Sequence, residues 1–155
     1  MEENTNNIVQ DAYYLISLFE KEGKNPTQLH IQKLMYLFEA YYMNVENVDK
    51  LYDCNYQAWN FGPVATPLYK ELKVYGKNPI ALTEEEREWA EEIPDKKKKL
   101  MKNLYEVFKN FTAMQLVNFT HAEGSPWNNA WNEKTYSEIS KKDIKQWFSK
   151  YVKKS

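Results

Sequence analysis

The stretch QLHIQKLMYLFEAYYM, residues 28–43, carries a strong helical pattern. Its apolar residues recur at steps of three and four, which is the period of a helix with one buried face. The face expected to enter the core consists of Ile31, Leu34, Met35, Phe38 and Tyr42. A second, mixed stripe on the same helix carries Gln32, Lys33, Tyr36 and Glu39. We therefore predict a central helix and look first to the mixed stripe for function.

The segments on either side of this helix predict a second helix and a short strand. Residues 8–22 repeat apolar side chains at helical spacing and stop before Gly23, a residue suited to a left-handed C-cap. Residues 51–58 alternate polar and apolar side chains, as a strand does. A lone strand leaves backbone groups unpaired, so we expect a partner strand at residues 78–82. Residues 59–64, WNFGPV, are expected to leave the strand through a Gly-Pro turn.

The second half of the chain is punctuated by helix start signals. Thr83 and Thr112 open capping boxes, and Ser125 and Ser140 are N-cap candidates. We find no linker, repeat or low-complexity segment. The prediction is a mainly α, single domain over residues 1–155, a compact bundle of about six to seven helices with one short β-hairpin.

Composition argues against several classes of protein. The formal net charge of −1 gives no long-range attraction to nucleic acid or anionic membranes, and Arg87 is the only arginine. Cys54 stands alone, so an internal disulfide is impossible. The polar, acidic N-terminal residues do not resemble a signal peptide, and no apolar run is long enough to span a membrane. We expect a cytoplasmic protein that binds neither membranes nor specific nucleic acid.

Catalytic and metal-binding patterns are weak. His30 and His121 are the only histidines, and no ligand pair with metal-site spacing occurs. Cys54 and Ser125 lack the surroundings of a nucleophile, and there is no glycine-rich phosphate loop. We expect no catalytic residue, no metal and no cofactor. The lysine run 96–99 could contact phosphates, but a solvated helix surface is the favoured interpretation.

Three blocks in a fixed order give a more specific signal. The first is LHIQKLMYLFEAY at residues 29–41. The second is YQAWNFGPV at residues 56–64, followed by Leu68-Tyr69. The third is Thr120-His121 with Ser125-Pro126-Trp127. Together they resemble the Panacea domain family, also described as SocA-like antitoxins or GepA-like phage-associated proteins, over residues 8–131.

The resemblance implies an antitoxin that binds and neutralises a protein toxin encoded beside it, on a prophage or another mobile element. Members of the family meet very different toxins. Some are thought to deliver the toxin to a protease and others to mask it, and the residues do not choose between these routes. The family supplies no catalytic residues. His30 is the one departure within the first block, where an aliphatic or polar residue is commoner.

The partner-binding site is expected where polar and aromatic residues of these blocks recur together. The candidates are Gln32, Lys33, Tyr36, Trp59, Phe61, Gly62, Pro63, Val64 and Tyr69. His121, Ser125, Pro126 and Trp127 are expected to form a structural motif. The alternative keeps these residues internal, with Gln32 and His121 satisfying buried backbone groups and Trp127 closing the core.

Two other functions stay open. An enzyme could use His121, Glu123 and His30 around a pocket under Trp127. An accessory DNA-binding repressor could use the lysines.

Overall fold

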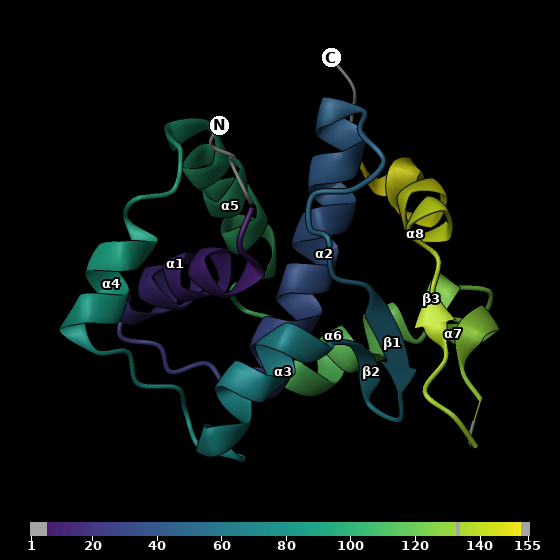
Figure 1. The fold of residues 1–155 in the computed structure, drawn as a ribbon, viewed down its shortest axis with the longest axis horizontal. Helices are drawn as coiled ribbons and strands as arrows, with labels where there is room; N and C mark the ends of the chain where they lie inside the picture. The colour runs from purple at the N-terminus through teal and green to yellow at the C-terminus, as the bar shows by residue number, and fades with distance from the viewer. Residues whose placement is uncertain (1–5, 133, 153–155) are drawn as a thin grey trace.

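The computed structural model describes residues 6–132 and 134–152, and these form eight α-helices, two 3₁₀ turns and one small antiparallel sheet (Figure 1). The prediction of a mainly α fold with a short hairpin is confirmed, with more helices than expected and a third strand. The elements in chain order are α1 (Ile8–Lys21), α2 (Gln28–Glu46), β1 (Tyr56–Trp59), β2 (Gly62–Ala65), α3 (Thr66–Leu72), η1 (Lys73–Tyr75), α4 (Glu84–Ala90), α5 (Asp95–Phe108), α6 (Ala113–Thr120), α7 (Pro126–Ala130), β3 (Glu138–Ile139), α8 (Lys141–Phe148) and η2 (Ser149–Tyr151).

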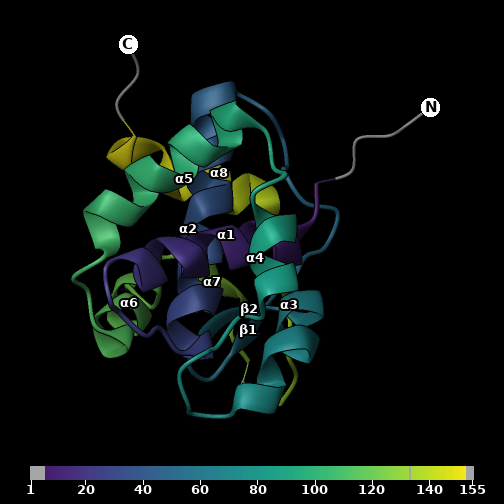
Figure 2. The ribbon, with the colours of Figure 1, turned by 90° about the vertical axis from the view of Figure 1, so that its left-hand side faces the viewer.

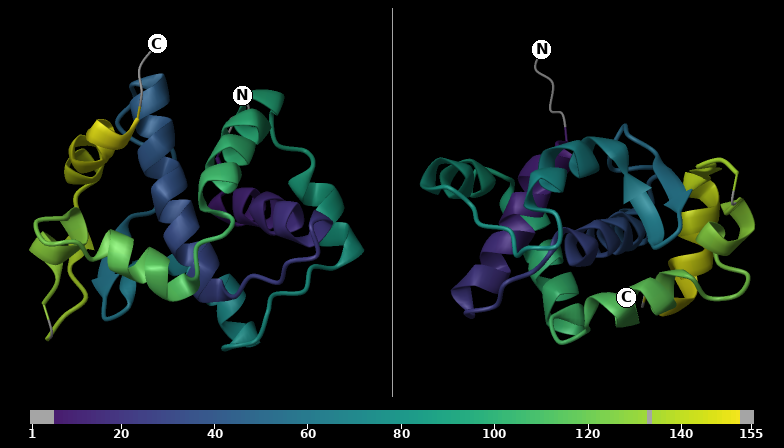
Figure 3. Two further views of the ribbon diagram at one scale, coloured as in Figure 1. Left: turned by 180° about the vertical axis from the view of Figure 1, so that it is seen from behind. Right: turned by 90° about the horizontal axis from the view of Figure 1, so that it is seen from below.

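Helix α2 is the centre of the molecule. It contacts α1, α3, α5, α6, α8 and β2, which surround it in Figures 2 and 3. Every residue from 31 to 40 is buried as a result. The predicted core face is therefore confirmed for Ile31, Leu34, Met35 and Phe38. The mixed stripe of Gln32, Lys33, Tyr36 and Glu39 is buried too.

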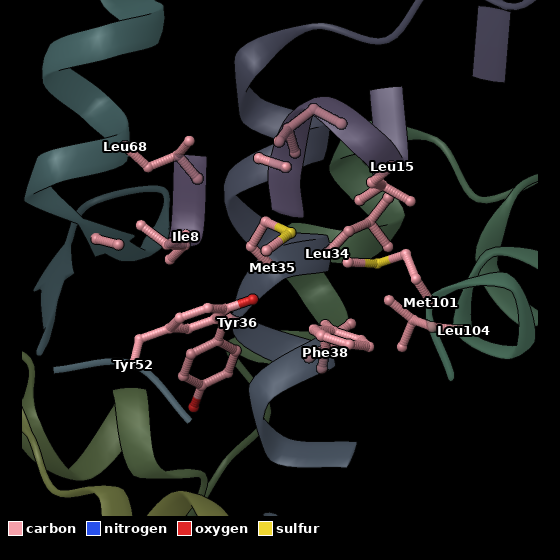
Figure 4. Close-up of a cluster of buried hydrophobic side chains, with 14 of the residues drawn as sticks. Ile8, Leu15, Leu34, Met35, Tyr36, Phe38, Tyr52, Leu68, Met101 and Leu104 are labelled. Carbon is pink, nitrogen blue, oxygen red and sulfur yellow. The ribbon is translucent and has the colours of Figure 1, made fainter. Parts of the chain in front are cut away.

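The core forms where α1 crosses α2 (Figure 4). Leu34, Met35 and Phe38 of α2 pack there with Leu15 of α1, and α5 closes the cluster with Met101. An apolar cluster of this size is the main source of stability in a domain of this length. It also fixes α2 rigidly, so anything attached to α2 is held in place.

The sheet has the order β2-β1-β3. Strand β1 pairs antiparallel with β2, Tyr56 opposite Ala65 and Trp59 opposite Gly62, and with β3, Tyr56 opposite Ile139. The predicted partner at residues 78–82 is wrong: this segment is not a strand, and Ile80 N–H donates to the carbonyl of Pro26. Both edges of β1 are already occupied, by the segment taken as a turn and by β3.

The helix starts predicted for the second half of the chain are confirmed. Thr83 and Thr112 both form complete capping boxes, and the Ser125 and Ser140 hydroxyls accept from the N–H groups of Asn128 and Asp143. No helix in the described ranges is both long and apolar enough to cross a membrane.

Two buried ion pairs tie distant elements together. Asp11 of α1 lies 3.0 Å from the amine of Lys97 in α5, and both side chains are buried. Lys97 was expected in solvent with the rest of the 96–99 run, and its partner on α1 explains the difference. Glu39 of α2 accepts from Lys141 Nζ at 2.8 Å and from the backbone N–H groups of Leu51 and Tyr52. These contacts hold α5 against α1, and they hold α8 and the 51–52 segment against α2.

Removing the cation of the first pair should be costly. Burial raises the pKa of Asp11, while Lys97 and the Tyr52 hydroxyl oppose that shift. The Lys97→Met variant leaves this carboxyl buried without its cation, and we expect a loss of about 3 kcal/mol in the free energy of unfolding. Lys99→Met, at an exposed position of the same helix, should change it by less than about 0.5 kcal/mol. Urea denaturation checks both values, and equal effects would show that the pair contributes little.

Candidate functional site

Two consecutive side chains of α2 cover the outer edge of the hairpin. Gln32 Nε2 donates to the carbonyl of Ala65 at 3.3 Å, and its Oε1 accepts from the Ala65 N–H at 3.0 Å. Lys33 Nζ donates to the carbonyl of Pro63 at 3.2 Å. Pro63 has no N–H of its own to satisfy. Gln32 therefore does satisfy buried backbone groups, as the internal interpretation expected, and α2 occupies the β2 edge.

Gly62 is required by the same contact. Its φ of +115° is a conformation that other residues rarely adopt, and a Cβ built there would clash with Lys33 Cε. The amine behind it is buried without a carboxylate, and burial lowers the pKa of Lys33 to about 7. The predicted residues Lys33, Gly62 and Pro63 thus form one close contact between helix and hairpin.

Beside this contact lies a hollow of about 660 Å³, here called the hairpin pocket. Six of the nine predicted partner-binding residues line it: Gln32, Lys33, Trp59, Phe61, Val64 and Tyr69. The structure adds residues that the sequence did not single out, among them Gln28, Lys77, Met114 and Tyr136. Met114 lies in the first turn of α6 and Tyr136 in the segment before β3, so no local pattern links them to the hairpin.

The wall of the hairpin pocket is aromatic. The Trp59 ring stacks on Tyr136 with centroids 4.7 Å apart, and Tyr69 meets it edge-on at 4.9 Å. The indole N–H of Trp59 donates to Gln57 Oε1 at 2.9 Å. Trp59 therefore offers an incoming group only its ring surface.

The third block supports the hairpin from behind and does not line the pocket. Trp127 is buried, and its indole N–H donates to the Trp59 carbonyl at 2.7 Å. His121 stacks on Trp127 with centroids 3.6 Å apart, and Ser125 caps the helix that Pro126 begins. Burial and the nearby Lys33 amine lower the pKa of His121. Trp127 closes the structure as the structural interpretation expected, whereas His121 Nε2 finds no partner among the described residues.

Tyr36 lies away from the hairpin pocket. It is fully buried and packs edge-on against Tyr56 and Phe148. Its contacts are those of a core residue, so we assign it no contact with a partner.

The residues considered for an enzyme are not brought together. His30 Nε2 lies 3.2 Å from the Phe111 carbonyl, and its ring meets Phe19, while His121 stacks on Trp127. Within residues 6–132 and 134–152, no group of three His, Cys, Asp or Glu side chains is arranged to hold a metal ion.

Substituting Gly62 should test the close contact. We expect Gly62→Ala to lower the free energy of unfolding by about 3 kcal/mol, because backbone strain and the clash with Lys33 add. Gly23→Ala is the control, since its φ of +73° is strained but nothing lies within 4 Å of the added Cβ, and it should cost about 1 kcal/mol. Thermal denaturation checks both, and the clash is absent if the two losses are equal or if Lys33→Ala restores nothing to Gly62→Ala.

Lys33 should also leave a signature in the pH dependence of stability. The pKa of Lys33 is about 7 when folded and near 10.5 when unfolded, so the unfolded chain binds more protons between these values. The free energy of unfolding should therefore rise with pH across this window, by about 2–4 kcal/mol more than in Lys33→Met. His121 does not interfere, because its lowered pKa lies below the window. Denaturant titrations from pH 7 to about 10 measure the difference, and parallel curves for the two proteins would contradict it.

A family profile described as Antitoxin SocA-like, Panacea domain, matches residues 31–128. The matched region starts in α2 and ends in α7, so it contains the Gln32 and Lys33 contacts, the hairpin and the His121–Trp127 stack. Searches of the curated proteins and of the solved structures gave no significant match. Since the matched region covers more than half of the 155 residues, the chain belongs to the SocA-like antitoxin family of Panacea domains.

Proposed function

We propose that this protein is an antitoxin that neutralises a protein toxin by binding it directly at the rim of the hairpin pocket. The family relation supports the class of function. The observation that carries the location is a group of large apolar side chains exposed at the rim: Phe61 is 62% exposed, Tyr136 55% and Met114 53%. Exposed aromatic groups around a hollow are typical of the anchors that dominate protein interfaces.

The sheet and α2 make this rim suitable for recognition. Phe61 lies at the turn between β1 and β2, and the hairpin is fixed by α2 on one side and by Trp127 on the other. A rigid anchor loses little conformational entropy on binding. The rim can therefore contribute more of its contact energy to affinity than a mobile loop could.

The genetic and cellular setting is part of the same proposal. We propose a toxin gene beside the antitoxin gene, on a prophage or another mobile element, and a complex that forms in the cytoplasm. Masking of the toxin is the simpler mechanism, because it needs only the rim. Delivery to a cytoplasmic protease is the alternative, and it requires a second surface.

The lysine run gives little support to the DNA-binding alternative. Lys96, Lys97 and Lys98 each lie within ion-pair distance of a carboxylate, on Glu46, Asp11 and Glu91. Lys141 is likewise paired with Glu39. Paired lysines have less charge to offer to phosphates.

Co-expression with the protein encoded by the adjacent gene tests the proposal. We expect the antitoxin to relieve growth arrest and to co-purify with the toxin. Phe61→Ala should weaken the complex by about tenfold or more, as truncation of an interface anchor does. Titration calorimetry of the purified pair measures the change.

Val107→Ala is the matched control. Val107 is 65% exposed on α5, beside a separate apolar groove between α2, α5 and α8, and its truncation should leave affinity unchanged within about twofold. The opposite pattern would move the interface to that groove. Toxin that persists in the rescued cells indicates masking, whereas loss of toxin protein indicates delivery to a protease.

A further inference from the structure

The charges around the hairpin pocket have one sign. Its lining contains Lys33 and Lys77 and no aspartate or glutamate. Lys77 is exposed, and no carboxylate within the described residues pairs with it. The buried amine of Lys97 and the partly buried amine of Lys141 each face a carboxylate, whereas Lys33 has only the Pro63 carbonyl. The Lys77 charge at the rim is therefore not neutralised by the pocket's own walls.

The residues that line the hairpin pocket determine which side chains fit into it. Trp59 and Tyr136 form a stacked aromatic surface, and a volume of about 660 Å³ is within the range of pockets that bind small ligands. Gln28 adds a polar group: its Oε1 is buried and has no donor among the residues that the structure describes. An N–H group of a ligand could supply that donor.

Addition of a partner strand to β2 is excluded by the contacts of α2. The Ala65 N–H and carbonyl are bonded to Gln32, and the Pro63 carbonyl is bonded to Lys33. Strand addition needs free backbone groups along the edge. Recognition at this pocket must therefore proceed through side chains that enter it.

We propose that the hairpin pocket receives an acidic segment of the partner that carries an aromatic side chain, the ring lying against Trp59 and Tyr136 and the carboxylates facing Lys77 at the rim. This assignment rests on the proposed function, because it names the chemistry of the toxin segment. The aromatic group supplies contact area, and the carboxylates supply the charge that the pocket lacks.

Short peptides test the pocket without the toxin. The probes are Ac-Glu-Trp-Glu-NH₂, its uncharged analogue Ac-Gln-Trp-Gln-NH₂, its basic analogue Ac-Lys-Trp-Lys-NH₂ and the ring-free Ac-Glu-Ala-Glu-NH₂. Titration into ¹⁵N-labelled protein should shift the resonances of the hairpin and of the Trp59 indole most with the first peptide. We expect it to bind at least about threefold tighter than the uncharged analogue, and the other two to bind more weakly still.

Charge reversal at the rim supplies the matched variants. Lys77→Glu should remove the preference for the acidic peptide, and Lys99→Glu, an exposed change of the same kind on α5, should keep it. Equal binding of the acidic and uncharged peptides, shifts centred on Val107, or no shift with the acidic peptide at about 5 mM would overturn the assignment.

The toxin experiment separates this assignment from the proposed function. A toxin complex that is insensitive to Lys77→Glu, together with peptides that are not distinguished, refutes the acidic segment and leaves the antitoxin function intact. Selective peptide binding without any toxin complex refutes the function and leaves the pocket chemistry standing.

Discussion

The hydrogen bonds from Gln32 and Lys33 to the β2 edge are the constraint on which the site depends. Polar residues on a buried helix are costly unless they find partners, because an unpaired polar group in the core loses its hydrogen bonds to water. Four polar side chains of α2 find partners on other elements: Gln32 and Lys33 hold β2, Glu39 holds the 51–52 segment, and Asn44 bonds the carbonyl of Lys145 in α8. The polar residues of α2 thus position neighbouring elements, and its apolar residues form the core with them.

The lysine amines inside the fold differ in the partners that they meet. Lys97 and Lys141 meet carboxylates, and removal of either would leave a carboxylate of α1 or α2 without its cation. Lys33 meets a single carbonyl, and burial lowers the pKa of its amine to about 7. A fold that needed only packing there could use a methionine of similar length. The amine beneath an aromatic pocket is the feature that a purely structural role explains least well.

Much of the fold could be predicted from the sequence because its signals are local. Capping boxes and helical periodicity depend on residues three or four apart, and those at Thr83, Thr112 and Ser125 were correct. The predicted strand partner at residues 78–82 is wrong because Gly62 and Pro63 look like a turn in the sequence. In the structure they belong to strand β2, where Pro63 lies at an edge that Lys33 covers, so its lack of an N–H group costs nothing. The buried pair of Lys97 was also out of reach, since Asp11 lies on another helix. The sequence predicted the residues of the candidate site that lie on the hairpin. It did not predict Met114 and Tyr136, because only the tertiary fold brings them near the hairpin.

The contacts that support the hairpin join residues far apart along the chain, and this affects the order in which they can form during synthesis. Trp59 is bonded by Trp127, 68 residues later, and Glu39 by Lys141, 102 residues later. A nascent chain that has emerged only as far as the hairpin lacks β3, Tyr136 and both of these contacts, and two-stranded hairpins are marginal in water. Contacts between residues so far apart along the chain require long loops to close. Both contacts and β3 become available only after the chain has been synthesised beyond Lys141, so the hairpin pocket is completed only then.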